Sequence, residues 1–270
     1  MLELEHRFRA IDVHARLSVD EDHSVRGRMI SPDHLEREMR QAGVERAIVV
    51  PETPPSGRVL QYNNAVARLS VGRPFVAFAR INGPGDPKGS PAGKLREVVA
   101  SRQDHHTGPS DIEHYGYEDR FHGFVLDPGR DGLPDAETLD VLEEVDLPLL
   151  VRGGDAFPPR RAAKTLLSRS FPTILAHFGG HPLNRDLMAE AIDLLEEFDR
   201  YYLETSYVRY REPLERALLE HPDRILFGSG APASHPSVAV MELLTLDVSE
   251  DKMRRAFEKN PRRVFDLEES

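Results

Sequence analysis

The sequence contains no cysteine among its 270 residues. It therefore has no disulfide, no thiolate metal ligand and no cysteine nucleophile, and any metal site must use histidine and carboxylate side chains. No apolar run approaches the roughly 20 residues that span a bilayer. The amino-terminal stretch MLELEHRFRA also carries charges where a signal peptide has its apolar segment. We therefore expect a cytoplasmic protein with no membrane partner.

Positive charge is also in short supply, with 35 Lys and Arg against 46 Asp and Glu and a net charge of −11 at pH 7. A nucleic-acid partner is not expected, because binding a polyphosphate needs a basic face that displaces counterions. The hydrophobic content of 39% and charged content of 30% are typical of a globular protein. The length suits one large α/β domain or two small ones.

Short aliphatic runs alternate with segments of helical periodicity along the chain. The clearest run is FPTILAHFGGHP at 171–182. It is too short for a helix and contains a glycine pair, which is typical of a fully buried parallel strand with His177 at its carboxyl end. Ser31 and Pro32 begin a helix that Gly43 ends. The expected strands are 7–14, 45–51, 74–82, 121–128, 147–154, 171–182, 201–207 and 224–232.

Helices are expected between these strands, at 31–43, 63–69, 92–102, 136–145, 159–168, 187–198 and 213–219, and again beyond Pro236. The polar segment 103–120 is expected to be a long loop that could cover the site as a lid. Strands alternate with helices without a break in composition, and no strand is followed by a glycine-rich dinucleotide loop. This pattern predicts an α/β fold, a single (β/α)8 TIM-type barrel that forms one domain over residues 1–270.

Several segments, taken in this order, resemble the amidohydrolase-related family, the amidohydrolase 2 branch of the metal-dependent hydrolases. They are IDVHAR (11–16), REMRQAGVERAIVVP (37–51), FVAFARIN (75–82), LPLLVRGG (147–154), LAHFGG (175–180), YLETS (202–206), RILFGSGAP (224–232) and KNPRRVFDL (259–267). The resemblance covers nearly the whole chain. It implies a barrel whose mouth can hold one divalent metal ion. It also implies the activity of a hydrolase, decarboxylase, hydratase or lactonase that acts on small carboxylates or aromatic acids.

The metal-ligand set that the resemblance implies is only partly present. The family's His-x-His is His14 followed by Arg16, its strand-five histidine is matched by Arg152, its strand-six histidine is His177, and its strand-eight aspartate is matched by Gly230. Two imidazoles are one short of the three protein ligands of a typical catalytic zinc, and arginine offers no lone pair. We therefore expect a degenerate metal site and no cofactor. If zinc or manganese does bind, its ligands are His14 and His177.

The two arginines favour an anionic substrate. Arg16 and Arg152 can supply the positive charge that an ion would otherwise provide, and can hold a carboxylate through paired hydrogen bonds. The expected catalytic residues are the strand-end side chains that can transfer a proton: His14, His177, Glu204 and Asp127. The expected substrate-binding residues are Arg16, Arg152, Arg80, Asn82 and His181.

The sequence leaves three functions open. The first is a hydrolase or lyase, of decarboxylase or lactonase type, that acts on a small carboxylate without the usual metal. The second is an inactive barrel that binds or senses a small molecule, with its arginines paired to Asp12, Asp127 and Glu204. The third is a metal-dependent hydrolase with replacement ligands from His181 or the segment 103–120. Each has a small molecule as its partner, and a homodimer is compatible with all three.

Overall fold

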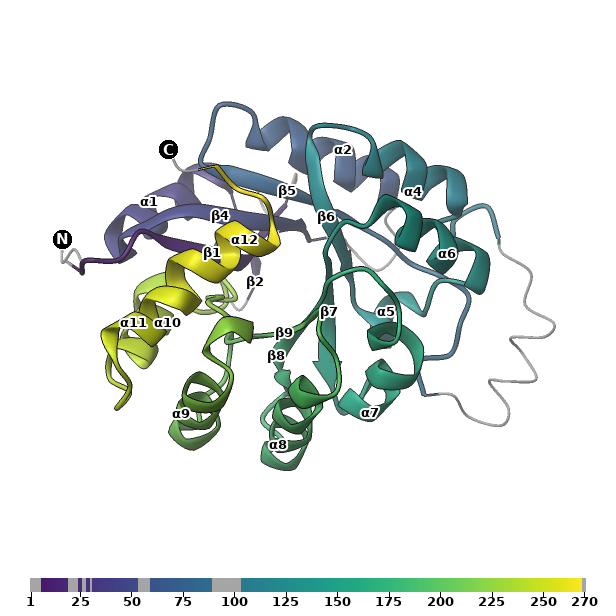
Figure 1. Ribbon diagram of the computed structural model, residues 1–270. Helices are drawn as coiled ribbons and strands as arrows, with labels where there is room; N and C mark the ends of the chain where they lie inside the picture. Colours follow the sequence, from purple (N-terminus) through teal and green to yellow (C-terminus); the bar gives the residue numbers. More distant parts are fainter. Residues whose placement is uncertain are drawn as a thin grey trace.

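Eight parallel strands form a nearly closed barrel in the computed structural model, which describes residues 6–18, 24–25, 28–29, 31–52, 59–88 and 103–268. The strands follow one another in chain order around the wall, with helices on the outside (Figure 1). Backbone hydrogen bonds of 2.9 Å from Val13 to Phe227 and from Arg16 to Ala231 join the first and last strand regions. The predicted (β/α)8 barrel is therefore confirmed.

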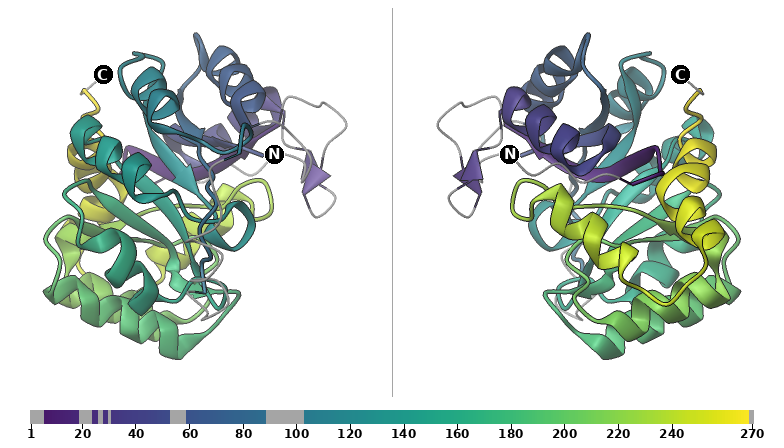
Figure 2. Two further views of the ribbon diagram at one scale, coloured as in Figure 1. Left: turned by 90° about the vertical axis from the view of Figure 1, so that its right-hand side faces the viewer. Right: turned by 90° about the vertical axis from the view of Figure 1, so that its left-hand side faces the viewer.

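Each barrel strand lies within or overlaps a predicted strand. The strands are β1 (Ala10–Leu17), β4 (Val44–Pro51), β5 (Phe75–Arg80), β6 (Phe121–Leu126), β7 (Leu149–Gly154), β8 (Thr173–His181), β9 (Tyr201–Glu204) and β10 (Ile225–Leu226). Most of their residues are buried, because helices cover the outer face and side chains fill the interior. Two further short strands, β2 (Ser24–Val25) and β3 (Arg28–Met29), pair antiparallel outside the barrel wall (Figure 2).

The helices agree with the predictions at most positions. They are α1 (Pro32–Ala42), α2 (Val59–Ser70), α4 (Pro109–Gly116), α5 (Pro128–Asp131), α6 (Ala136–Val145), α7 (Pro159–Ala162), α8 (Arg185–Asp193), α9 (Arg211–Glu220), α10 (Pro236–Leu244), α11 (Glu250–Arg254) and α12 (Asn260–Val264). π-helical turns extend two of them, at Ala163–Leu167 and Arg255–Lys259, and 3-10 turns lie at Leu194–Glu196 and Pro222–Arg224. None of the described helices has the length and apolar character needed to cross a membrane.

The segment 103–120 differs from its prediction. It contains α4, which begins at Pro109 after Gly108 and buries Ile112 and Tyr115, so the prediction of one long loop is wrong. Two buried apolar residues three positions apart are enough to hold one helical face against the protein. The predicted helix at 92–102 lies outside the described residues.

Two apolar clusters define the inside and the outside of the barrel wall. The larger joins outward-facing strand residues to helix residues such as Leu35 and Met39 of α1. The smaller fills the interior and includes Ile11 and Val13 of β1 and Ile174 and Ala176 of β8. The two clusters show which face of the wall each strand residue occupies. Because side chains alternate along a strand, they also predict which polar residues at the strand ends would point inward.

Candidate metal centre at the barrel mouth

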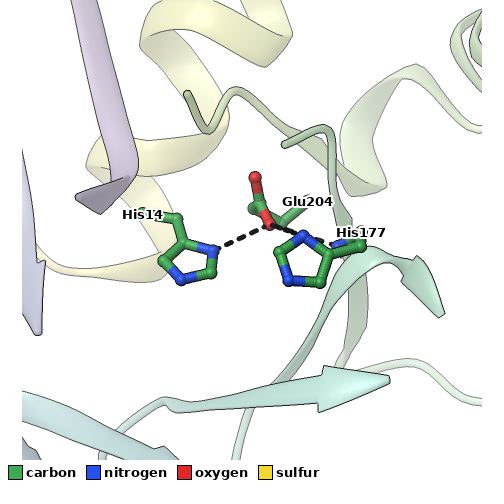
Figure 3. A group of neighbouring side chains, drawn as sticks. All are labelled: His14, His177 and Glu204. Atoms are coloured by element: carbon green, nitrogen blue, oxygen red, sulfur yellow. Dashed lines mark hydrogen bonds and ion pairs between the residues drawn. The ribbon is translucent and has the colours of Figure 1, made fainter. Parts of the chain in front are cut away.

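Three buried side chains meet at the carboxyl ends of three strands. His14 of β1, His177 of β8 and Glu204 of β9 each offer a possible ligand atom, and these atoms lie within 4.8 Å of one another (Figure 3). The imidazole rings of His14 and His177 stack with centroids 5.3 Å apart. His14 Nδ1 lies 3.2 Å from Glu204 Oε2. The structure therefore brings together three of the four predicted catalytic residues.

Irregular backbone turns both histidines into the barrel. In β8, Ile174 and Ala176 face the interior, so strict alternation would send His177 outward. His177 instead has a φ of 61°, a left-handed conformation that changes the direction of the chain. In β1, Val13 faces the interior, and an irregularity in register lies between Asp12 and Ala15. Such an irregularity changes the direction of the side chains within it, and here His14 points into the mouth.

Glu204 is fully buried and accepts several hydrogen bonds. Its Oε2 accepts from the backbone N–H of His177 at 3.2 Å and from the Ser206 hydroxyl at 2.8 Å, and its Oε1 accepts from the Ser206 backbone N–H. Burial raises the pKa of Glu204 above its usual value, while His177 and the Ser206 hydrogen bonds oppose the shift. The carboxylate is thus held in one place by its donors.

Gly228 makes room for this carboxylate. A Cβ at position 228 would lie 1.9 Å from Glu204 Oε1. We expect Gly228→Ala to displace Glu204 and to lower the free energy of unfolding by about 1–3 kcal/mol, the usual cost of overpacking. Urea unfolding of the metal-free protein measures this. An alanine variant as stable as the wild type would show that Glu204 has room to move.

His177 has one ring nitrogen with partners and one without. Its Nδ1 lies 2.7 Å from the hydroxyl and 3.1 Å from the carbonyl oxygen of Ser206. Its Nε2 is buried and has no hydrogen-bond partner among the described residues. A buried polar atom without a partner needs an explanation, and a bound ion is one. This orphaned nitrogen, next to a second imidazole, fits a metal ion.

Both histidines are held in the neutral state that a metal ligand requires. Burial lowers the pKa of His14 to about 3, with the nearby positive charges of Arg16 and Arg152 adding to the effect. Burial also lowers the pKa of His177 well below its usual value. At neutral pH both rings therefore offer a lone pair without having to lose a proton first.

The low pKa of His14 predicts a pH effect on stability. Between pH 6.5 and about 3, the unfolded chain protonates this imidazole but the folded protein does not, so stability falls as the pH is lowered through that window. We expect His14→Asn to remove this loss, so the metal-free wild type should weaken relative to the variant between pH 7 and pH 4.5. Asp12, whose pKa burial raises to about 6, acts with the opposite sign. It is present in both proteins and cancels in the comparison. Urea unfolding at several pH values tests this, and parallel pH profiles would contradict it.

The two mouth arginines are paired with carboxylates. Arg152 donates to Asp127 at 2.9 Å, and its second terminal nitrogen lies 2.6 Å from His181 Nε2. Arg16 pairs with Glu52 at 3.5 Å, and not with the expected partners Asp12 or Glu204. Because the Arg152 side chain is 35% exposed, a ligand can reach it at the mouth. His181, an alternative metal ligand in the sequence analysis, here contacts Arg152.

Arg80 and Asn82, predicted to bind substrate, have structural partners. Arg80 is buried and forms an ion pair of 2.8 Å with Asp131. The Asn82 side chain donates to the carbonyl of His105 at 3.0 Å and accepts from the backbone N–H of Thr107 at 2.7 Å. These contacts anchor the segment that leads into α4. Among the described residues, His14, His177 and Glu204 form the one set of three possible metal ligands this close together.

Asp12 lies beside the histidines but bonds to the chain after β10. It accepts from the Ser229 backbone N–H at 2.9 Å, from the Ser229 hydroxyl at 2.5 Å and from the His14 backbone N–H at 3.0 Å. These bonds connect β1 to the last strand region and fix the backbone at His14. Asp12 therefore supports the site through the backbone.

Tyr207 takes the space of the absent strand-eight aspartate. Gly230 has a φ of 70°, and a Cβ there would lie 2.5 Å from the Tyr207 ring carbon Cζ. The Tyr207 hydroxyl donates to the Gly230 carbonyl at 2.5 Å, and its ring lies 5.0 Å from that of His177. The sequence analysis did not include Tyr207. The sequence feature that could have identified Tyr207 as a site residue is its position three residues after Glu204, beyond the carboxyl end of β9.

Comparison with known proteins identifies the family. The mouth holds two histidines and a carboxylate that could together hold an ion, and the sequence profile of the family described as Amidohydrolase matches residues 11–267. The chain therefore belongs to the amidohydrolase family, as its sequence motifs predicted. No protein of curated function matches it in sequence.

Solved structures with the same fold share little sequence with this chain. A 2,6-dihydroxybenzoate decarboxylase from Rhizobium is 16% identical, with a TM-score of 0.66 over 96% of this chain and 99% of that one. A dihydroxybenzoic acid decarboxylase from Polaromonas sp. JS666, with bound manganese and the inhibitor 2-nitroresorcinol, is 17% identical, with a TM-score of 0.64 over 98% of both chains. A probable 2-pyrone-4,6-dicarboxylic acid hydrolase from Acinetobacter baumannii, with citric acid bound, is 14% identical, with a TM-score of 0.61 over 96% of this chain and 100% of that one.

The expectation of no metal cofactor is wrong. Manganese is bound in a similar structure, and His14, His177 and Glu204 form a group that can hold an ion. The expectation came from counting only the ligand positions of the family pattern, where Arg16, Arg152 and Gly230 stand. Glu204, on a different strand, lies beside both histidines and was not considered in that count.

Proposed function

We propose that this protein is a divalent-metal-dependent hydrolase or lyase that acts on a small carboxylate-bearing substrate. The observation that carries the proposal is the buried Nε2 of His177, which has no hydrogen-bond partner among the described residues. Its ring is stacked beside a second neutral imidazole at the carboxyl ends of the strands. Family membership adds support, because this end of the barrel is where enzymes of the fold build their sites.

The group of His14, His177 and Glu204 is the proposed place for the ion. Imidazole and carboxylate suit both manganese and zinc. When bound, such an ion polarises a substrate oxygen or lowers the pKa of a water. The buried position of all three side chains keeps competing water away and strengthens electrostatic interactions at the mouth.

The substrate carboxylate is proposed to bind the two mouth arginines. Arg16 and Arg152 are both close enough to His14 to lower its pKa, so an anion between them lies next to the ion site. Asp127 and His181 hold Arg152 in position from one side. The rings of His181 and Tyr207, each about 5 Å from that of His177, offer aromatic surfaces to a planar substrate. Aromatic carboxylic acids are therefore the first class to test.

Proton transfer is proposed for Asp127. Of the four predicted catalytic residues, His14, His177 and Glu204 form the proposed ion site, which leaves Asp127 for proton transfer. Its carboxylate lies at the mouth, bonded to the arginine that would bind the substrate. It can exchange a proton with a water or with a substrate atom held there.

Metal titration combined with a substrate panel tests the proposal. Protein without a histidine tag is stripped with a chelator and titrated with Mn²⁺ and with Zn²⁺ by calorimetry. It is then assayed for carbon dioxide release from hydroxybenzoates and for hydrolysis of carboxylated lactones. We expect about one ion per chain and turnover that chelation abolishes. Absence of both binding and turnover would contradict the proposal and favour an inactive binding barrel.

A further inference from the structure

We infer that Glu204 is a positioning carboxylate for both histidines, which contacts the His14 ring directly and the His177 ring through the Ser206 hydroxyl, the relay. It fixes both rings as Nδ1–H tautomers and leaves both Nε2 lone pairs facing one ion. The part of this inference that concerns the ion rests on the proposed function. It assigns to Glu204 a role through the histidines, because its oxygens already have partners.

The hydrogen bonds to Glu204 account for its acceptor capacity. Oε2 takes bonds from His14 Nδ1 at 3.2 Å, the Ser206 hydroxyl at 2.8 Å and the His177 N–H at 3.2 Å, and Oε1 takes one from the Ser206 N–H. Each carboxylate oxygen has two lone-pair sites, so the three donors on Oε2 more than fill that oxygen, while Oε1 lies against Gly228. Direct ligation through Oε2 would require one of these buried donors to lose its partner, which is costly.

The tautomer of His177 follows from the partners of its Nδ1. The Ser206 hydroxyl gives its proton to Glu204, so its oxygen can only accept from the ring, 2.7 Å away. The Ser206 carbonyl, 3.1 Å away, accepts only. Nδ1 therefore carries the ring proton, and the buried Nε2 is a bare lone pair with no partner among the described residues.

The same reasoning applies to His14. Its Nδ1 lies 3.2 Å from Glu204 Oε2 and 3.4 Å from the Ser206 hydroxyl oxygen, and both are acceptors. Nδ1 is therefore protonated in this ring too. Figure 3 shows the other ring nitrogen of each histidine on the side turned away from Glu204. With the rings stacked at an interplanar angle of 29°, the two lone pairs can converge on one ion.

Ring-nitrogen NMR of the metal-free protein tests the inference directly. In protein labelled with ¹⁵N-histidine, long-range ¹H–¹⁵N spectra distinguish a protonated ring nitrogen from a bare one, and His14→Gln and His177→Gln variants assign the two rings. We expect Nδ1–H for both. A protonated Nε2 in either ring would overturn the inference, whether or not a metal binds.

Titration with Zn²⁺ separates this inference from the proposed function. We expect the ion to shift the Nε2 resonances of both histidines. Shifts at Nδ1 would overturn the inference and leave metal binding intact. No binding would refute the proposed function and the part of the inference that concerns the ion, while the tautomers would still be decided by the metal-free spectra.

Ser206 provides a second test with a matched control. If Ser206 is the relay, Ser206→Ala weakens Zn²⁺ binding by roughly 10-fold or more, as is usual for partners of metal-bound histidines. Ser206→Thr, which keeps the hydroxyl, restores binding. If Glu204 is a ligand, Ser206→Ala frees an acceptor site on it, and unchanged or tighter binding would overturn the inference. Ser234→Ala, at a buried serine that contacts Arg209, is the control and leaves Zn²⁺ affinity unchanged.

Discussion

Replacement of His177 by asparagine is expected to abolish stoichiometric binding of Mn²⁺ or Zn²⁺ and to lower kcat/KM by about a thousandfold or more, because a bound ion supplies several kcal/mol of transition-state stabilisation. Asparagine tolerates the left-handed backbone at this position, where φ is 61°. Its amide can still donate a hydrogen bond to Ser206. It has no counterpart of the Nε2 lone pair, so the variant removes the ligand atom and keeps the local fold.

Metal analysis and calorimetry on the stripped protein measure this effect. His221→Asn, at the carboxyl end of α9, is the matched control and should bind metal as the wild type does. The melting temperature of the metal-free His177→Asn protein should stay close to that of the wild type, because the lost nitrogen has no hydrogen-bond partner in the described part of the chain. A variant that still binds one ion per chain would show that the ion site lies elsewhere.

The sequence was sufficient to predict the barrel but not the direction of its key side chains. Eight buried strand runs separated by amphipathic helices determine the wall, since a parallel sheet must be covered on both faces. Alternation along β8, counted from the inward-facing Ile174 and Ala176, sends His177 to the outer face. The left-handed backbone conformation of His177 reverses this direction. It depends on tertiary contacts, and no local sequence pattern around His177 and Phe178 predicts it.

The helix α4 was missed, and the partners of Glu204 were not predicted, for a similar reason. α4 has only two buried side chains, Ile112 and Tyr115, so its apolar periodicity is too weak to stand out within a polar segment. Glu204 was predicted as a site residue from its place at a strand end. Its partners come from β1, β8 and the residues after β10, and contacts between such distant segments cannot be read from spacing along one strand.

The positive charge near the ion site is balanced in this arrangement. Arginines beside a cation would repel it, and this repulsion adds to the ligand count as a reason for expecting no metal. In the structure, Arg152 pairs with Asp127 and Arg16 with Glu52, so each guanidinium is close to neutralised before any ligand arrives. A substrate carboxylate between them adds a further negative charge. In the proposed function, metal and arginines therefore bind the same anion without excluding one another.

Removal of Arg152 is expected to have the second large effect, on substrate binding. Arg152→Ala should raise the KM for a carboxylate substrate by about 10-fold to 100-fold, since hydrogen bonds to charged groups contribute about 1.5–3 kcal/mol. Metal content should not change, because the hydrogen bonds of the Arg152 guanidinium go to Asp127 and His181 and not to the three side chains of the ion site. This separates the loss from that of His177→Asn.

Two comparisons make the result specific to the carboxylate. Arg152→Lys keeps the charge but loses the planar fork of donors, so it should recover only part of the affinity. Arg185→Ala removes an exposed arginine paired with Glu212 outside the mouth, and should leave KM unchanged. An uncharged amide analogue of the substrate should bind the wild type and Arg152→Ala equally. Equal KM values for the carboxylate itself in those two proteins would show that Arg152 holds Asp127 and His181 in place and does not contact the substrate.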